Sequence, residues 1–159
     1  LYTRICNEKF ALIGDIHLVL GNISSNEYTT ETADGRGKSV DEAMERIARI
    51  PCGDKLMMNS FEIKEIARYV YESQIYMVFE ALMQIRSYIA SLGLDPSTFK
   101  AIIAGIGKFL AREAAIRAGF KTIIDIDDIV GSQISSIFPA YAAAMMMCEK
   151  RCFDNENCG

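Results

Sequence analysis

Apolar residues recur every three or four positions over three stretches of the chain, which is the spacing of one face of an α-helix. The first stretch covers residues 8–21 and ends at Gly21. The second begins after Ser39, and the spacing of Ser39 and Glu42 is that of a capping box, which marks a helix start. Pro51 and Gly53 end this second stretch. We therefore predict two short amphipathic helices.

The third stretch begins with the same start pattern at Asn59 and Glu62 and continues to Gly93. Its length, over thirty residues, predicts a long helix and leaves open whether that helix is continuous or contains a break. Its apolar face requires another element to pack against. Between the first two stretches, residues 22–38 are polar and rich in threonine and glycine, so we expect a loop there. Residues 1–6 predict the end of a strand.

The pattern changes after residue 98. Two short apolar runs, 99–104 and 121–126, lie on either side of an alanine-rich helical segment at 108–118. A strand–helix–strand succession is the unit of a parallel sheet. Residues 131–136 are small and predict a loop, and the chain from residue 138 predicts a last helix with Pro139 in its first turn.

The pattern as a whole predicts a helix-rich α/β fold with a few parallel strands flanked by helices. So few strands do not complete a doubly wound sheet, so we expect residues 1–149 to form part of a larger fold. Residues 150–159 are polar and predict a frayed tail. The sequence begins at Leu1 rather than at methionine, which leaves a fragment or a processed product open.

Composition narrows the functional classes. The chain has 159 residues, of which 50% are hydrophobic, so intrinsic disorder is excluded. A net charge of −4 without a basic stripe argues against a nucleic-acid partner. The longest apolar run, residues 137–148, is too short to span a membrane, and no signal-peptide pattern opens the chain. Five scattered cysteines, an odd number, predict reduced thiols and a cytoplasmic protein.

One candidate site is the turn Gly105-Ile106-Gly107-Lys108, which joins a predicted strand to a predicted helix. Glycines let the backbone approach a ligand closely, and the exposed amides of a helix start favour an anion. Lys108 adds a positive charge. The turn matches neither a dinucleotide-binding nor a Walker pattern, so tight packing of the helix on the strand is the alternative interpretation.

A second candidate is the loop at 32–38, where Asp34, Arg36 and Lys38 alternate with Gly35 and Gly37. Such a loop can hold a phosphate through its two bases and a metal ion through Asp34. A solvated turn is the alternative.

Other polar residues have open roles. His17 lies on the apolar face of the first helix, where a satisfied core histidine is more common than a catalyst, and Asp15 lies beside that face. Three acids follow the second predicted strand, at the strand end where open α/β sheets bind ligands. These acids can hold Mg²⁺ or cap a helix; they are Asp125, Asp127 and Asp128.

Four strings occur in an order that resembles archaeal tetrahydromethanopterin-linked one-carbon-transfer pathway proteins. They are Leu1-Tyr2-Thr3 followed by Ile5-Cys6, Gly14-Asp15-Ile16-His17 with Leu20-Gly21, Thr32-Ala33-Asp34-Gly35-Arg36-Gly37-Lys38, and Gly105-Ile106-Gly107-Lys108-Phe109-Leu110. This family is related to hydantoinase A/oxoprolinase and has the actin-like, sugar-kinase-like ATPase fold. The resemblance covers nearly all of the chain but only the C-terminal half of the family, so it implies the family's N-terminal half as a missing partner.

Some members of that family build methanofuran. They condense an aminomethylfuran-methyl diphosphate with gamma-glutamyltyramine and release diphosphate, with Mg²⁺. The resemblance therefore implies a transferase with these small-molecule substrates. It implies that Gly105, Gly107 and Lys108 face a phosphate and that Arg36 and Lys38 contact an anion. Asp15 and Asp34 are then the candidates for catalysis, with Asp34 also the candidate metal ligand.

Two other classes of function stay open. The wider fold implies an ATP-dependent kinase or a hydantoinase/oxoprolinase-type enzyme, with ATP as its cofactor. A non-enzymatic interaction domain that uses the face of the long helix is the second alternative, and a homodimer is compatible with it.

Overall fold

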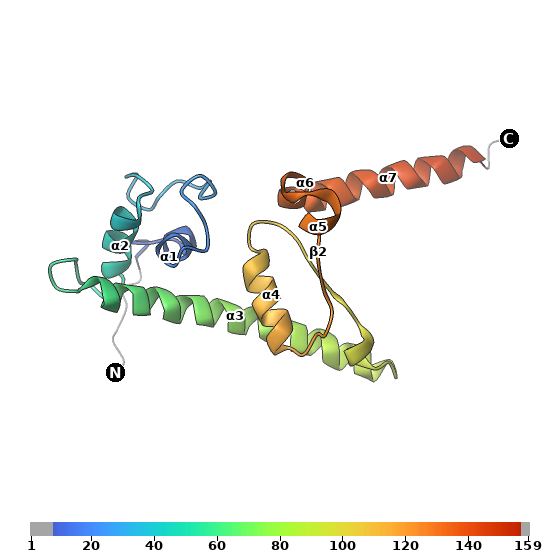
Figure 1. Cartoon of the computed structure of the whole chain (residues 1–159), viewed down its shortest axis with the longest axis horizontal. Helices are drawn as coiled ribbons and strands as arrows, with labels where there is room; N and C mark the ends of the chain where they lie inside the picture. Colours follow the sequence, from blue (N-terminus) through green and yellow to red (C-terminus); the bar gives the residue numbers. More distant parts are fainter. Residues whose placement is uncertain (1–7, 157–159) are drawn as a thin grey trace. The chain divides into compact units, whose positions relative to one another are not determined.

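The computed structural model describes residues 8–156, which form two compact units, one up to Met77 and one from Val78 (Figure 1). We describe each unit by itself. The strand predicted over residues 1–6 lies outside the described residues.

The first unit consists of α1 (Ile13–Val19), α2 (Val40–Ala48) and the beginning of α3 (Ser60–Ser91). Helices α1 and α2 pack against each other. Residues 22–38 contain neither helix nor strand, as the sequence predicts. Buried apolar residues of these helices form one core with Tyr28 from the loop between α1 and α2; its members are Ile16, Leu18, Val19, Tyr28, Ala43, Met44, Ile47, Ala48, Ile63 and Ala67.

Both predicted capping boxes are confirmed. The Ser39 hydroxyl accepts a hydrogen bond from the Glu42 amide at 3.2 Å, and the Glu42 carboxylate accepts one from the Ser39 amide at 3.1 Å. Asn59 and Glu62 make the same exchange at 3.1 and 2.8 Å. The long helix has no break, because α3 is continuous over 32 residues. Sharp helix breaks usually occur at proline or glycine, and α3 contains neither residue.

The first helix is shorter than predicted. The chain is extended at Leu12, and its amide is bonded to the Asp15 carboxylate at 2.9 Å, so α1 starts only at Ile13. Phe10 therefore lies outside the helix. The predicted helix is too long because the apolar residues before Leu12 have the spacing of a helix although their backbone is not helical.

His17 is a core residue, as expected for a lone histidine on an apolar face. It is 6% exposed, its Nδ1 lies 3.3 Å from the Asn22 side-chain amide, and its ring meets Tyr71 edge to face. Burial lowers the pKa of His17 below its ordinary value of 6.5. The unfolded chain therefore binds a proton more readily than the folded one.

We expect the free energy of unfolding to fall as the pH drops from about 7.5 to about 5.5, through the ordinary range of histidine. Stability from a lowered histidine pKa is present above the pKa of the unfolded state and is lost on acidification. Urea unfolding at the two pH values measures the change. His17 is the only histidine, so a His17→Gln variant isolates its contribution. An unchanged pH dependence in that variant would contradict the assignment.

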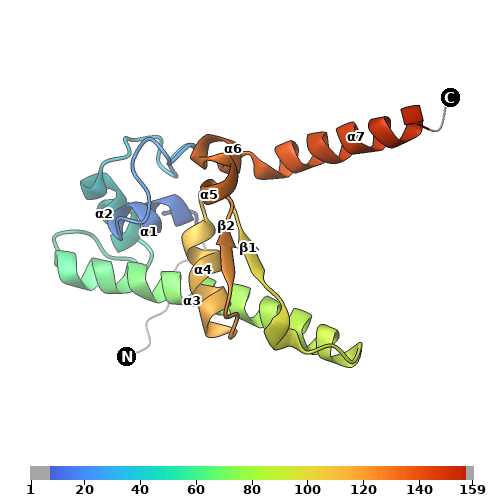
Figure 2. The same ribbon diagram turned by 45° about the vertical axis from the view of Figure 1, so that its right-hand side comes forward.

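The second unit contains the end of α3, the turn η1 (Pro96–Thr98), β1 (Ala101–Ile103), α4 (Lys108–Arg117) and β2 (Ile123–Asp125). The two strands pair in parallel with Ala101 opposite Ile123. Figure 2 shows them side by side, with α4 beside them. The predicted strand–helix–strand crossover is thus confirmed.

The chain after β2 differs from the prediction. Helix α6 (Ser132–Ser136) replaces the loop predicted over residues 131–136, and a further short helix, α5 (Asp127–Val130), precedes it. Gly131, between the two helices, has a positive φ of +83°. The last helix, α7 (Phe138–Glu156), continues into the tail predicted from residue 150. A segment of small, serine-rich residues usually predicts a loop. Here Gly131 ends one short helix, and its positive φ allows the next helix to begin directly after it.

The structure confirms a helix-rich α/β chain with a small parallel sheet. The actin-like ATPase fold stays a prediction. None of the helices in residues 8–156 combines the length and the apolar content needed to cross a bilayer.

Candidate functional site

The predicted loop at 32–38 is tied together by arginines around Asp34. The Asp34 carboxylate accepts hydrogen bonds from Arg36 Nε at 2.8 Å and Arg46 Nη1 at 3.2 Å, and Arg49 Nη1 lies 3.5 Å away. Desolvation raises the pKa of Asp34, but the hydrogen bonds from Arg36 and the Arg46 charge outweigh it and lower the pKa to about 2. Asp34 is therefore a charged anchor for three guanidinium groups.

Asp15 belongs to the same network and is completely buried. Its Oδ1 atom accepts hydrogen bonds from Arg46 Nε and Nη2 at 2.9 and 2.7 Å, and its Oδ2 atom accepts one from the Leu12 amide. Asp15 and Arg46 are both 0% exposed. In this position the carboxylate holds α2 against the start of α1 and offers no exposed oxygen to a substrate. The catalytic role predicted for Asp15 stays a prediction.

Gly14, which precedes Asp15 in the family string, has a packing role. A Cβ atom on Gly14 would lie 2.5 Å from a ring carbon of Tyr28. Only glycine allows the Tyr28 ring to pack this closely against α1.

The two bases predicted as anion contacts already have protein partners. Arg36 bonds to Asp34 and to Glu45, the latter at 2.6 Å, and these carboxylates raise its pKa. The Lys38 ammonium donates to the Tyr28 carbonyl and lies 5.2 Å from the centre of the Tyr28 ring. Their role as anion contacts stays a prediction that requires them to exchange these partners for the ligand.

The glycine turn between β1 and α4 differs from the loop at 32–38 because some of its hydrogen-bond donors are unpaired. Gly105 has a φ of +83°, which favours glycine, and its amide donates to Ser135 Oγ at 3.2 Å. Within the described part of the chain, the amides of Ile106 and Gly107 have no hydrogen-bond partner. A Cβ atom on Gly107 would meet nothing within 4 Å. The turn thus presents two unpaired N–H groups in open space, which suits an anion.

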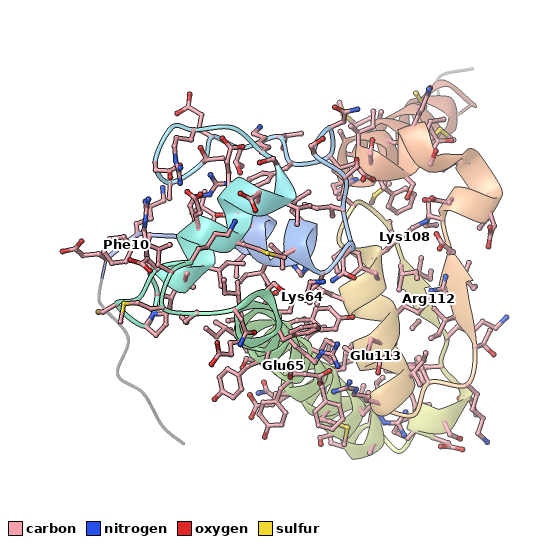
Figure 3. The ribbon with its side chains drawn as sticks, turned by 60° about the vertical axis from the view of Figure 1, so that its left-hand side comes forward. Phe10, Lys64, Glu65, Lys108, Arg112 and Glu113 are labelled. Carbon is pink, nitrogen blue, oxygen red and sulfur yellow. The ribbon has the colours of Figure 1, made fainter. Side chains whose placement is uncertain are left out.

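Lys108 lies directly after this turn, at the carboxyl ends of the strands. Its ammonium is 3.2 Å from the Asp125 carboxylate and also donates to Asp127. Arg112, one helical turn later, contacts Asp125 at 2.8 Å. Figure 3 shows the Lys108 and Arg112 side chains on α4, beside β2. The hydrogen bond that Lys108 donates to Asp127 is the largest of the effects that raise the pKa of Lys108, which keeps the amine protonated.

Both carboxylates remain ionised. The hydrogen bond from Lys108, followed by one from Ser135, lowers the pKa of Asp127. Burial raises the pKa of Asp125, but bonds from the Asp127 amide, Lys108 and Arg112 outweigh it, so its pKa is also lowered. The strand ends therefore carry fixed charges of both signs next to the unpaired amides.

A family model for hydantoinase/oxoprolinase matches residues 5–151 of this chain. The chain belongs to the hydantoinase/oxoprolinase family. This confirms the resemblance inferred from the strings that contain Asp15, Asp34 and Gly105.

Two curated relatives match this hydantoinase/oxoprolinase chain. One from Methanocaldococcus jannaschii is 26% identical over 145 residues, which cover 91% of this chain and 41% of the relative. One from Methanococcus vannielii is 25% identical over 148 residues, which cover 91% of this chain and 64% of the relative. Both are named (4-{4-[2-(gamma-L-glutamylamino)ethyl]phenoxymethyl}furan-2-yl)methanamine synthase. The chain thus spans less than two thirds of either relative.

Cationic side chains already contact both candidate places for Mg²⁺ in this family member. Asp34 shares its oxygens with three guanidinium groups, so a divalent cation there would meet strong repulsion. At Asp125 and Asp127 a divalent cation would have to displace the Lys108 ammonium and the Arg112 guanidinium. Asp125 and Asp127 are 11% and 25% exposed at the strand ends. Mg²⁺ commonly uses one or two carboxylates together with substrate phosphates. The described residues contain no cluster of three or more potential metal ligands, so the pair fits only this shared mode.

Sequence reasoning missed three residues of these networks. Arg46 follows Ala43 by three positions and so lies on the buried side of α2, a signal that was available. Ser135 lies in a segment whose small residues predict a loop, and Arg112 is one of several charged residues on the alanine-rich helix. Their partners are distant in sequence, so no local spacing marks them.

Proposed function

We propose that this chain is part of a synthase that joins an aminomethylfuran-methyl diphosphate to the phenol of gamma-glutamyltyramine. A bond forms between the furan methylene carbon and the phenol oxygen. The bond from that carbon to the diphosphate oxygen breaks, the diphosphate leaves with the electron pair, and the phenol loses its proton to a base. The names of the two relatives contain this phenoxymethyl-furan linkage, which supports the proposal.

The observation that carries the proposal is the glycine turn. Unpaired amides at Ile106 and Gly107 and the protonated Lys108 lie together at the carboxyl ends of two parallel strands. Donors fixed in advance stabilise charge that develops on a leaving group, because they need no reorganisation during the reaction. We assign the departing diphosphate to this turn.

Asp125 and Asp127 would hold Mg²⁺ next to the turn. When bound, Mg²⁺ neutralises charge on the diphosphate and so makes it a better leaving group. Lys108 donates to both carboxylates, so it would exchange these partners for the diphosphate when Mg²⁺ binds. Ser135 holds the turn in place through the Gly105 amide.

The test is diphosphate release by the purified protein that carries this chain, supplied with Mg²⁺ and the furan diphosphate. We expect release only when gamma-glutamyltyramine is also present, together with formation of the aryl ether. Absence of release with both substrates would overturn the proposal. A parallel assay contains added ATP. Consumption of this ATP in place of ether formation would favour the kinase-type alternative.

A further inference from the structure

A pocket of about 460 Å³ opens on the surface of the first unit. Glu45 and Arg49 line it from the end of α2, and Asp54, Lys55 and Leu56 line it from the turn that leads to α3. Its size is within the range of small-molecule sites. None of the networks described above gives this pocket a role.

The local backbone brings these residues to one place. Helix α2 ends at Ala48, and the Gly53 amide bonds back to the Ala48 carbonyl at 3.1 Å. Cys52 has a φ of +61°, a left-handed conformation that is unusual for a residue other than glycine. The chain therefore reverses sharply. The Asp54 Oδ1 atom then accepts the Leu56 and Met57 amides at 2.8 and 2.9 Å, which fixes the carboxylate.

Two of the charged groups in the pocket use only part of their hydrogen-bonding capacity. Arg49 makes one long contact, 3.5 Å to Asp34, and its other donors have no partner within residues 8–156. The Asp54 Oδ2 atom likewise has no partner in this part of the chain. Glu45 and Lys55, by contrast, are paired with Arg36 and Asp41. The pocket therefore offers a ligand one guanidinium edge and one carboxylate oxygen.

The charge balance selects the class of ligand. Two acids and two bases line the pocket, so its formal charge is zero. A dianion would meet Glu45 and Asp54, and a simple cation would meet Arg49 and Lys55. A zwitterion matches both signs at once, and Arg49 suits its carboxylate through a bidentate contact. Leu56 is 97% exposed and provides an apolar surface for methylene groups.

We propose that this pocket binds the α-amino carboxylate group of an amino-acid-type ligand. Arg49 binds the carboxylate, and Asp54 accepts hydrogen bonds from the ammonium. If the proposed function holds, the ligand is the glutamyl end of gamma-glutamyltyramine. Its γ-linkage leaves the α-ammonium and the α-carboxylate free.

The first test is a titration of the whole chain with gamma-glutamylethylamide, which carries the glutamyl end without the phenol. We expect a dissociation constant on the order of 1 mM, as is usual for so small a ligand. The N-acetylated probe lacks the ammonium, and the α-carboxamide probe lacks the carboxylate. Each is expected to bind at least about tenfold more weakly. Equal binding of all three probes would overturn the proposal.

Two variants assign the groups. Asp54→Asn keeps the Oδ1 acceptor of the turn, so the fold is retained, and it should reduce the preference for the free ammonium over the N-acetylated probe about tenfold. Arg49→Gln should instead reduce the preference for the carboxylate over the carboxamide. Arg68→Gln is the matched control, because Arg68 is 65% exposed on α3 and does not line the pocket. Unchanged preferences in both variants would overturn the assignment.

These binding measurements use no diphosphate, so their result is separate from that of the condensation assay. Probe binding without ether formation would support the pocket and contradict the proposed function. Ether formation without probe binding to the whole chain would support the proposed function and contradict the pocket.

Discussion

Replacing Arg46 with methionine is expected to lower the free energy of unfolding by about 3–5 kcal/mol, because it leaves the Asp15 carboxylate buried without a partner. Arg46 and Asp15 are both 0% exposed and share two hydrogen bonds of 2.9 and 2.7 Å. Arg46 also supports Asp34 and the Gly37 carbonyl, so its loss releases the loop at 32–38 as well. Urea unfolding measures the change.

Arg49→Met is the matched control for this prediction. It makes the same chemical change one helical turn away, but Arg49 is 41% exposed and contacts Asp34 at only 3.5 Å. Its effect should stay below about 1 kcal/mol. Adding Asp15→Asn to Arg46→Met removes the unpaired charge and keeps an acceptor for the Leu12 amide, so stability should partly return. Equal effects of Arg46→Met and Arg49→Met would contradict the buried-network account.

Replacing Lys108 with glutamine is expected to reduce the kcat for diphosphate release about 100-fold, the usual effect of removing one group that stabilises developing charge. The variant removes the cation next to the turn and leaves the Asp125 and Asp127 carboxylates to repel the diphosphate. The expected loss is therefore mainly in catalysis. Steady-state kinetics of the protein that carries this chain measure it.

Lys121→Gln provides the control for charge alone, since Lys121 is an exposed lysine of the same unit, before β2. It should leave the kcat within about twofold, because surface charges that lie away from the site are screened by salt. If the two variants lose activity equally, Lys108 has no specific role in the proposed site.

The sequence predicted the elements whose signals are local. Ser39 and Asn59 start helices because a side chain and an amide three residues later satisfy each other. The two strands were recognisable because short apolar runs flank a helical segment, which leaves parallel pairing as the simplest connection. The glycine turn followed from its place between them.

The features that the sequence did not predict are mostly pairings between residues that lie far apart in the chain. Asp15 and Arg46 are 31 residues apart, and Gly105 and Ser135 are 30 apart, so no periodicity links them. The same holds for two of the three arginines around Asp34, because Arg46 and Arg49 follow it by 12 and 15 residues. The role of Asp34 as a metal ligand stays a prediction. A charged residue on a predicted apolar face, such as Arg46, is the sequence signal most worth following.

The central claim is that the turn between β1 and α4 binds diphosphate. The most direct measurement is an NMR titration of the whole chain with diphosphate and Mg²⁺ that follows the backbone amides. The account predicts saturable shifts of the Ile106, Gly107 and Lys108 amides, and loss of these shifts in Lys108→Gln. Shifts confined to Arg36 and Lys38, or no saturable shift at the turn, would contradict it.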